Sequence, residues 1–401
     1  MTPDATPAPE HRAPWGFRIA AVALGCALAL LVAEVVLRVA LPQPTAPSHL
    51  VTDPDVGVRP RPGMSGTVRL PGVYTYRFSH DAEGFRSTPA PDGATPPEAS
   101  GGTPQVMILG DSFAYGMGVN DDETAASALA RGLAERGTPA EVVNAARIGA
   151  GPGYALRLLQ TRGQGWQPDV AVYLFYVNDY ANLQHATYFD ADSAGALTPV
   201  PPRDGPRQLK TRLSQIPGAR TLQAHSHVAG LVRRLAVSTL GDTGPQPSLY
   251  DLDTLRTPIA YSEPYRAWLA EAYFRALKAE VESRGGRLLA FYLPSAAEVA
   301  AYRRTGESTA DAETFEAILR RLGIDGQSLT GLLAARPEPI AALYYPEIHW
   351  RPLGHRVAAR AMLDPVQAAL CVKDAGLRGC ATAPADVRRI VGMRGGSGSG
   401  E

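Results

Sequence analysis

The chain has 401 residues, of which 45% are hydrophobic, so it can bury a substantial core, and its length would hold two average domains. Its 39 basic and 39 acidic residues cancel, and no dense basic cluster occurs, which argues against a nucleic-acid partner. Gly and Pro are concentrated in a few stretches, so we expect one principal domain with an arm and inserted segments.

The N-terminal segment predicts a single-pass membrane anchor. Residues 19–41 are apolar except for Glu34 and Arg38, which can neutralise one another on a helix near the membrane interface. A run of this length spans a hydrocarbon core of roughly 30 Å. Basic residues precede it, so we expect residues 1–18 in the cytoplasm and the rest in the periplasm or outside the cell. The alternatives are a cleaved signal peptide and a lipoprotein signal ending at Cys26, but the apolar run continues past this cysteine.

The segment 42–104 predicts a stalk, a small β arm and a linker. It begins with a proline-rich stretch that ends at Leu50 and indicates a stiff stalk. The stretches 67–70 and 73–78 alternate apolar and polar residues in the manner of strands. From Thr88 onward the composition is that of a linker, rich in Pro, Gly, Ala and Ser.

Strand-like and helix-like stretches then alternate through residues 105–380, which predicts a parallel sheet covered by helices on both faces. The predicted strands are 106–109, 140–143, 170–175, 287–293 and 342–345. The predicted helices are 124–136, 154–162, 224–237, one that follows an N-cap at Ser262, and 352–370. Residues 190–247 form a long insertion with one helix, and residues 381–401 are a Gly/Ser-rich tail that we expect to be disordered.

Two cysteines near the end predict a local disulfide. Cys371 and Cys380 lie close together in a stretch that we expect to be a loop. If the protein is exported, the oxidising compartment outside the cytoplasm favours a disulfide between them. The alternative is a pair of free thiols in a disordered tail. Neither cysteine has a neighbouring histidine or a metal-ligand pattern, so we expect no zinc, and no residue pattern calls for another metal or cofactor.

Polar residues follow the predicted strands. Gly-Asp-Ser-Phe at residues 110–113 comes directly after the strand 106–109, and the blocks 144–149, 178–179 and His349 follow later strands. The carboxyl ends of parallel strands meet at one edge of a sheet, so we expect these groups to lie together there. A serine nucleophile needs a base and hydrogen-bond donors for the oxyanion, and these blocks offer both.

Together the four blocks resemble the SGNH or GDSL hydrolase family over about residues 106–370: Gly-Asp-Ser-Phe, Asn-Ala-Ala-Arg-Ile-Gly, Val-Asn-Asp and Glu-Ile-His-Trp occur in the family's order. The resemblance implies an α/β fold, a three-layer, flavodoxin-like arrangement with a mostly parallel five-stranded sheet. It also implies that Ser112 is the nucleophile and His349 the general base. The implied oxyanion donors are the backbone N–H groups of Ser112 and Gly149 and the side-chain amide of Asn178.

Each of these residues also has a structural interpretation. Asp111 or Ser112 can cap the next helix, Gly149 can be a loop glycine, and Asn178 can cap a turn. We expect Asp111 to support the site and Asp179 to stiffen its loop through hydrogen bonds.

The sequence departs from the family pattern at two places. The acidic partner usually lies three residues before the histidine, where this chain has Pro346. Glu347 is the available carboxylate, and related members with an Asp-x-His pattern show that its offset can orient His349. The alternative is a solvent-facing glutamate. The glycine expected two residues before Asn178 is Tyr176, which we expect to narrow the cleft.

The expected function is a serine esterase acting on O-acyl esters of carbohydrate or other cell-envelope substrates. The anchor and Glu-Ile-His-Trp also resemble proteins that O-acetylate exported polysaccharides, so an O-acyltransferase with polysaccharide-modification partners is the alternative. A non-catalytic membrane-anchored scaffold with a degenerate hydrolase fold is the third, and the missing aspartate favours it. Motifs do not separate the first two, because their catalytic residues are the same.

Overall fold

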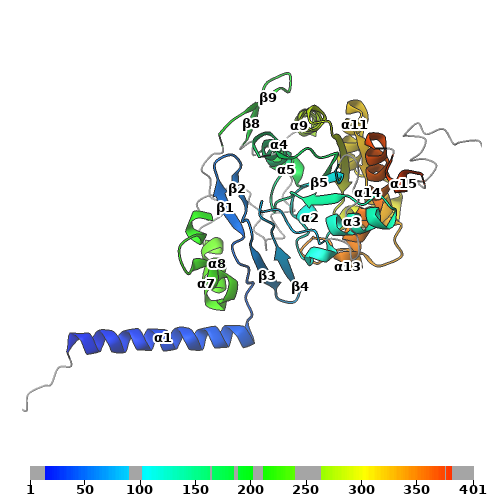
Figure 1. The fold of residues 1–401 in the computed structure, drawn as a ribbon. Helices are drawn as coiled ribbons and strands as arrows, with labels where there is room; N and C mark the ends of the chain where they lie inside the picture. Colours follow the sequence, from blue (N-terminus) through cyan, green and yellow to red (C-terminus); the bar gives the residue numbers. More distant parts are fainter. Residues whose placement is uncertain are drawn as a thin grey trace, which may run out of the picture.

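A five-stranded parallel sheet forms the centre of the computed structural model, which describes residues 14–89, 102–162, 165–184, 188–201, 211–239, 263–374 and 376–381 (Figure 1). The strands are β5 (Gln105–Gly110), β6 (Glu141–Asn144), β7 (Val170–Tyr176), β10 (Arg287–Leu293) and β11 (Asp325–Ser328). Their order is β11-β10-β7-β5-β6, and every neighbouring pair is parallel. This is the flavodoxin-like order, so the predicted α/β fold class is confirmed.

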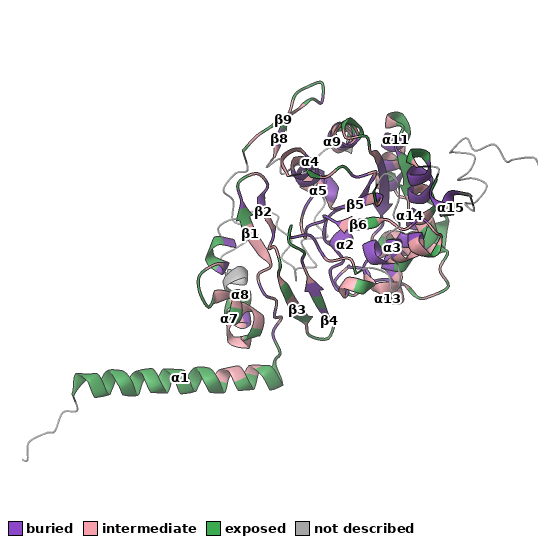
Figure 2. Cartoon of the chain, in the orientation of Figure 1, coloured by how far each residue is buried: buried purple, intermediate pink, exposed green. Residues whose placement is uncertain are grey.

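Helices cover both faces of the sheet, because alternate residues of each strand point to opposite sides. Along β5, Val106 and Ile108 join one hydrophobic cluster, whereas Met107 and Leu109 join the other. The first face is covered by α2 (Ser112–Tyr115), α3 (Ala125–Glu135), α10 (Ala296–Thr305), α12 (Thr330–Ala334), α13 (Ile340–Leu343) and α14 (Pro352–Lys373). The second face is covered by α4 (Pro152–Thr161), α5 (Asp179–Gln184), α9 (Glu263–Ser283) and α11 (Ala310–Leu322). Figure 2 shows the buried sheet between these two helical layers.

The prediction that residues 342–345 form the last strand is wrong. Residues 342–345 lie in the helical turn α13 and the residues that follow it, where Tyr344 forms only an isolated bridge to Trp350. A short apolar run fits a buried helical turn as well as a strand, so its pattern could not distinguish them. The fifth strand is instead β11, which forms one edge of the sheet, is largely exposed and has no apolar residue in its Asp-Gly-Gln-Ser sequence.

The long helix before β10 coincides with the predicted one. Leu269, Tyr273, Leu277 and Val281 of α9 are all buried, which is what an apolar face packed on a sheet requires. The N-cap predicted at Ser262 lies outside the described residues. So do residues 90–101 of the predicted linker and residues 382–401 of the predicted tail.

The N-terminal segment forms the helix α1 (Trp15–Ala40). In the described part of the chain it is the one helix long and apolar enough to cross a membrane, with a mean hydropathy of 2.5. Glu34 and Arg38 pair on it at 2.9 Å, as their spacing predicts.

The arm consists of two antiparallel hairpins. One pairs β1 (Leu50–Asp53) with β2 (Gly57–Pro60), and the other pairs β3 (Ser65–Leu70) with β4 (Tyr74–Ser79). The segment before them, predicted to be a stiff stalk, packs along the arm. Thr45 is buried and exchanges two backbone hydrogen bonds with Arg69, of 2.8 and 3.0 Å.

The insertion holds more regular structure than predicted. It begins with a small hairpin of β8 (Phe189–Ala191) and β9 (Leu197–Pro199). It continues with helical residues at 211–214 and with the longer helices α7 (Ala219–His225) and α8 (His227–Thr239), where one helix was expected. Residues 202–210 and 240–262 lie outside the described part of the chain.

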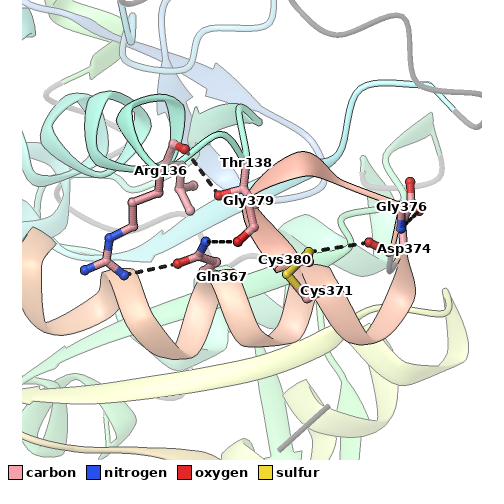
Figure 3. Close-up of a disulfide and its surroundings, with 9 residues drawn as sticks. Arg136, Thr138, Gln367, Cys371, Asp374, Gly376, Gly379 and Cys380 are labelled. Carbon is pink, nitrogen blue, oxygen red and sulfur yellow. Dashed lines mark hydrogen bonds between the residues drawn. A yellow bond between two sulfur atoms is a disulfide. The ribbon is translucent and has the colours of Figure 1, made fainter. Parts of the chain in front are cut away.

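Cys371 and Cys380 form a disulfide (Figure 3). The stretch between them is not wholly a loop, because Cys371 lies in the last turn of α14 and Cys380 lies in α15 (Arg378–Ala381). The amide of Gln367 also donates to the Gly379 carbonyl at 3.1 Å, so this end of the chain is held against α14.

Candidate active site

The turn after β5 places Ser112 at the start of a helix. Gly110 has a φ of +143°, and a Cβ there would lie 2.7 Å from the Leu174 carbonyl oxygen of β7 and 2.8 Å from the Ala114 Cβ, so only glycine fits. Asp111 then caps α2 by accepting a hydrogen bond of 2.8 Å from the Phe113 N–H. Ser112 is therefore the first residue of α2, at the carboxyl edge of the sheet.

A chain of hydrogen bonds joins Ser112 to residues far away in the sequence. Its Oγ lies 2.7 Å from His349 Nε2, and His349 Nδ1 lies 2.9 Å from Glu347 Oε2. The three residues are each only 7 or 8% exposed. The predicted nucleophile, base and acidic partner thus lie together, although His349 follows α13 rather than a strand.

The carboxylate determines which ring nitrogen of His349 carries the proton. An ionised carboxylate only accepts hydrogen bonds, so Nδ1 donates to Glu347 and Nε2 is left with its lone pair facing Ser112. The serine hydroxyl can then donate to Nε2. This is the arrangement in which an imidazole removes a proton from an attacking hydroxyl.

The backbone between Glu347 and His349 is strained. Ile348 has a φ of +104°, which makes it the one non-glycine residue with a positive φ in the described part of the chain. Such a conformation is rare for a β-branched residue and costs about 1–3 kcal/mol. It allows Glu347 Oε2 to turn back and accept from the His349 backbone N–H at 2.8 Å as well as from the ring. The strain therefore accompanies the short, two-residue offset of the carboxylate.

The other two predicted oxyanion donors lie in turns on either side of the Ser112 loop. β5 lies between β6 and β7 in the sheet, Gly149 lies in the turn after β6, and Asn178 lies in the turn after β7. Gly149 has a φ of +66°, which favours glycine at this position. The three loops that carry Ser112, Gly149 and Asn178 thus leave the same edge of the sheet.

Asp179 ties two of these loops together. Its Oδ2 accepts from the Tyr173 hydroxyl and the Tyr176 N–H, both at 3.3 Å, and its Oδ1 accepts from the Asn182 amide at 3.3 Å. The same amide of Asn182 donates to the Ala150 carbonyl at 3.2 Å, next to Gly149. Asp179 and Asn182 thus link the loop that carries Asn178 to the loop that carries Gly149.

Two buried carboxyl groups lie behind the serine. Burial raises the pKa of Asp111 to about 6, although the Phe113 N–H, the charge of His349 and the Asn178 side chain all lower it. Burial also raises the pKa of Asp179 well above its ordinary value, and the nearby charge of Asp111 raises it further. The ionised form of Asp111 is thus unfavourable for folding.

Asp111→Asn is expected to stabilise the fold at alkaline pH. The folded pKa of about 6 exceeds the ordinary 3.8, so the free energy of unfolding falls as pH rises through this window. Asparagine still caps α2 without a buried charge, so the variant should gain about 1–3 kcal/mol near pH 8, and this gain should vanish below about pH 4. Denaturant unfolding at both pH values measures this. A variant less stable than the parent near pH 8 would contradict the expected sign.

Aromatic rings pack behind the catalytic groups. The Phe113 ring stacks on Tyr176 with centroids 4.1 Å apart and lies 4.9 Å from the His349 ring. Trp350 is fully buried and meets Phe113 edge to face. Tyr176, which the sequence suggested would narrow a cleft, is buried and supports α2 through Phe113. Burial lowers the pKa of His355, packed on Trp350, to about 3, so this second histidine stays neutral.

The β arm borders the site, which sequence reasoning did not anticipate. His80 Nε2 lies 2.9 Å from the hydroxyl oxygen of Tyr115, the last residue of α2. The apolar cluster of the arm also includes Ile148, next to Gly149, and Tyr345, whose N–H donates to the His349 carbonyl at 2.7 Å. Contacts between segments so distant in sequence leave no local signal.

Glu347→Gln is expected to lower turnover of an acyl ester by about a hundredfold to ten-thousandfold. A neutral amide can present its NH₂ to the ring and so favours the wrong tautomer of His349. The steady-state kcat measures this, with Glu307→Gln, in an exposed loop, as the matched control. Rates near those of the parent would remove Glu347 from the site.

No model of a known protein family matches the chain, and no curated protein matches it. Among solved structures it is similar to an alpha/beta hydrolase enzyme from the metagenome of Lake Arreo, Spain, at 14% identity and a TM-score of 0.38, over 67% of this chain and 95% of that one. It is similar to a catalytic mutant of an acetylxylan esterase from Geobacillus stearothermophilus at 13% identity and a TM-score of 0.38, over the same shares. A lipase/acylhydrolase from Enterococcus faecalis matches at 12% identity and a TM-score of 0.36, over 66% of this chain and 95% of that one. Similarity this low carries no functional weight, so the function is inferred from the geometry of the site.

Proposed function

We propose that the chain is a serine esterase of the SGNH or GDSL type. The observation that carries the proposal is the series of hydrogen bonds from Glu347 through His349 to Ser112, with its two links of 2.9 and 2.7 Å. Residues 237 positions apart meet there, and a carboxylate at Nδ1 favours the tautomer that can activate a hydroxyl. A scaffold without catalysis would have no use for a buried, oriented imidazole against a serine.

The reaction then proceeds in two acyl transfers. His349 Nε2 takes the Ser112 proton while Oγ attacks the ester carbonyl, and the oxyanion accepts hydrogen bonds from the N–H groups of Ser112 and Gly149 and from the Asn178 amide. The carbon–oxygen bond breaks, and the alcohol leaves with the proton that His349 returns. Water attacks the acyl carbon while His349 takes its proton. The bond from this carbon to Ser112 Oγ then breaks, His349 returns the proton to Oγ, and the carboxylic acid is released.

The proposed substrates are O-acyl esters of carbohydrate or of other cell-envelope molecules. The helix α1 is proposed to anchor the chain in a membrane, with the esterase domain in the periplasm or outside the cell. The Cys371–Cys380 disulfide supports a location of this domain outside the cytoplasm, because disulfides persist in oxidising compartments. An envelope ester is the substrate that such a tethered domain can reach.

An O-acyltransferase acting on an exported polysaccharide is the second candidate. The same three side chains would form the acyl-enzyme, and a sugar hydroxyl would then replace water as the acceptor. The anchor favours this candidate, since polymer modification takes place where the polymer leaves the membrane.

Incubation of the full chain with acetylated xylo-oligosaccharides, with and without an unacetylated acceptor sugar, tests the proposal. An esterase releases acetate at a rate that the acceptor does not change, whereas an acyltransferase forms acetylated acceptor at the expense of acetate. Absence of both products, together with no turnover of a short-chain aryl ester, would contradict either form of the proposal. Ser112→Ala serves as the matched control.

A further inference from the structure

Two helices of the insertion are fixed to the end of the anchor helix. The carboxylate of Glu34 accepts from the Ser226 hydroxyl at 2.9 Å and from the backbone N–H groups of His227 and Val228 at 2.9 and 3.0 Å. Although Glu34 belongs to α1, its carboxylate thereby caps the N-terminus of α8. Arg38 donates to the His225 carbonyl at 2.8 Å, at the end of α7. Figure 1 shows α7 and α8 beside the C-terminal part of α1.

These contacts set the depth of the two helices relative to a membrane. A hydrocarbon core of roughly 30 Å takes about 20 helical residues, which counted from Ile19 end at Arg38. Glu34 and Arg38 therefore lie in the last turns of the span, where the chain leaves the membrane toward the esterase domain. The groups that they hold, at the start of α8 and the end of α7, lie at the same level.

The surface of residues 211–239, which comprise α7, α8 and the turns before them, has the composition of an interfacial segment. It contains four arginines and no acidic residue. Apolar side chains more than half exposed are Leu213, Ile216, Leu222, Val232 and Leu235. Outside α1 and this segment, only four large hydrophobic side chains of the described residues are exposed, by 41 to 53%. Exposed apolar groups beside basic ones are the features of helices that lie in a membrane interface.

We propose that residues 211–239 lie in the membrane interface on the side of the esterase domain, with the apolar side chains among the acyl chains and the arginines near anionic headgroups. The bilayer is favoured over a protein partner because the segment is hydrogen-bonded to the helix that crosses it. Two attachments, α1 and this segment, then restrict rotation of the domain about its tether. The inference concerns the anchor and does not depend on the chemistry of Ser112.

Site-directed fluorescence of the full chain tests this placement. Single cysteines, Leu222→Cys or Val232→Cys in a Cys26→Ser background, carry an environment-sensitive label after reconstitution into nanodiscs that contain phosphatidylglycerol. The disulfide of Cys371 and Cys380 remains formed. Both replaced side chains are more than half exposed, so the fold should tolerate the label. Glu307→Cys, in the exposed loop between α10 and α11, is the matched control.

We expect the labels at 222 and 232 to emit at shorter wavelength than the control, to be quenched by a nitroxide on the lipid chains, and to resist aqueous iodide. Arg220→Gln combined with Arg234→Gln should weaken the nitroxide quenching, as should discs of phosphatidylcholine alone. Iodide quenching equal to that of the control would overturn the proposal. A shift of the emission wavelength that appears only with two chains per disc would overturn the proposal as well. The exposed apolar side chains of residues 211–239 would then contact another copy of the chain.

Discussion

Ser112→Ala is expected to lower turnover of a short-chain acyl ester by about a thousandfold or more, because no other group can form the acyl-enzyme. Among the described side chains the hydroxyl bonds only His349, and alanine should keep the helix α2 intact. His349→Ala should lower turnover to a similar residual rate, and the double variant should be little worse than either, because the two residues act as a unit. Steady-state kinetics of the three variants measures this.

Ser283→Ala is the matched control for these variants. Ser283 lies exposed near the end of α9, so its loss should leave both turnover and thermal stability unchanged. Turnover retained in Ser112→Ala, with the control normal, would indicate a different nucleophile. If the factors by which the two single substitutions lower turnover multiply in the double variant, the two residues do not share one proton transfer.

Arg86→Ala, in the segment that follows the last strand of the arm, is expected to be strongly destabilising. The guanidinium is fully buried and donates to Asp121 Oδ1 at 2.8 Å and to the carbonyls of Gly116 and Val119 at 2.6 and 2.7 Å. Its removal takes the guanidinium donor away from Asp121 Oδ1 and from both carbonyls, while Ser79 still donates to Asp121 Oδ2, and the loss costs about 3–5 kcal/mol. Urea unfolding measures the loss. Turnover should fall too, because these carbonyls belong to the loop after α2.

Arg69→Ala provides the comparison for Arg86→Ala, since Arg69 is an exposed arginine of β3 in the same arm. Its removal should change the free energy of unfolding by less than about 0.5 kcal/mol. Equal effects of the two substitutions would show that Arg86 does not hold the arm against the loop that follows Ser112.

Much of the fold could be predicted because the sheet's buried strands have clear patterns. The apolar runs of β5, β7 and β10 are bounded by Gly, Asn or Pro, and each of their residues meets a helix layer. The edge strand β11 could not be predicted, since half of its surroundings is solvent and no apolar pattern is required there. The prolines at 42–47 indicate extended chain, but they could not show that this chain packs against the arm.

The site could be predicted as a set of residues but not as a geometry. Ser112 and His349 stand out because polar residues end apolar runs in a familiar order. The positive φ of Ile348, which brings Glu347 onto the ring, has no signature in an isoleucine. The bonds of Glu34 to α8 were equally hidden, because they depend on how a distant insertion folds back on the anchor.

Covalent labelling with a fluorophosphonate tests the central claim most directly, because such probes react only with an activated serine. Labelling of the full chain followed by peptide mass spectrometry should find the phosphonate on Ser112, and His349→Ala should suppress it. Absence of labelling in the folded parent chain, or a label on another serine, would contradict the proposed nucleophile.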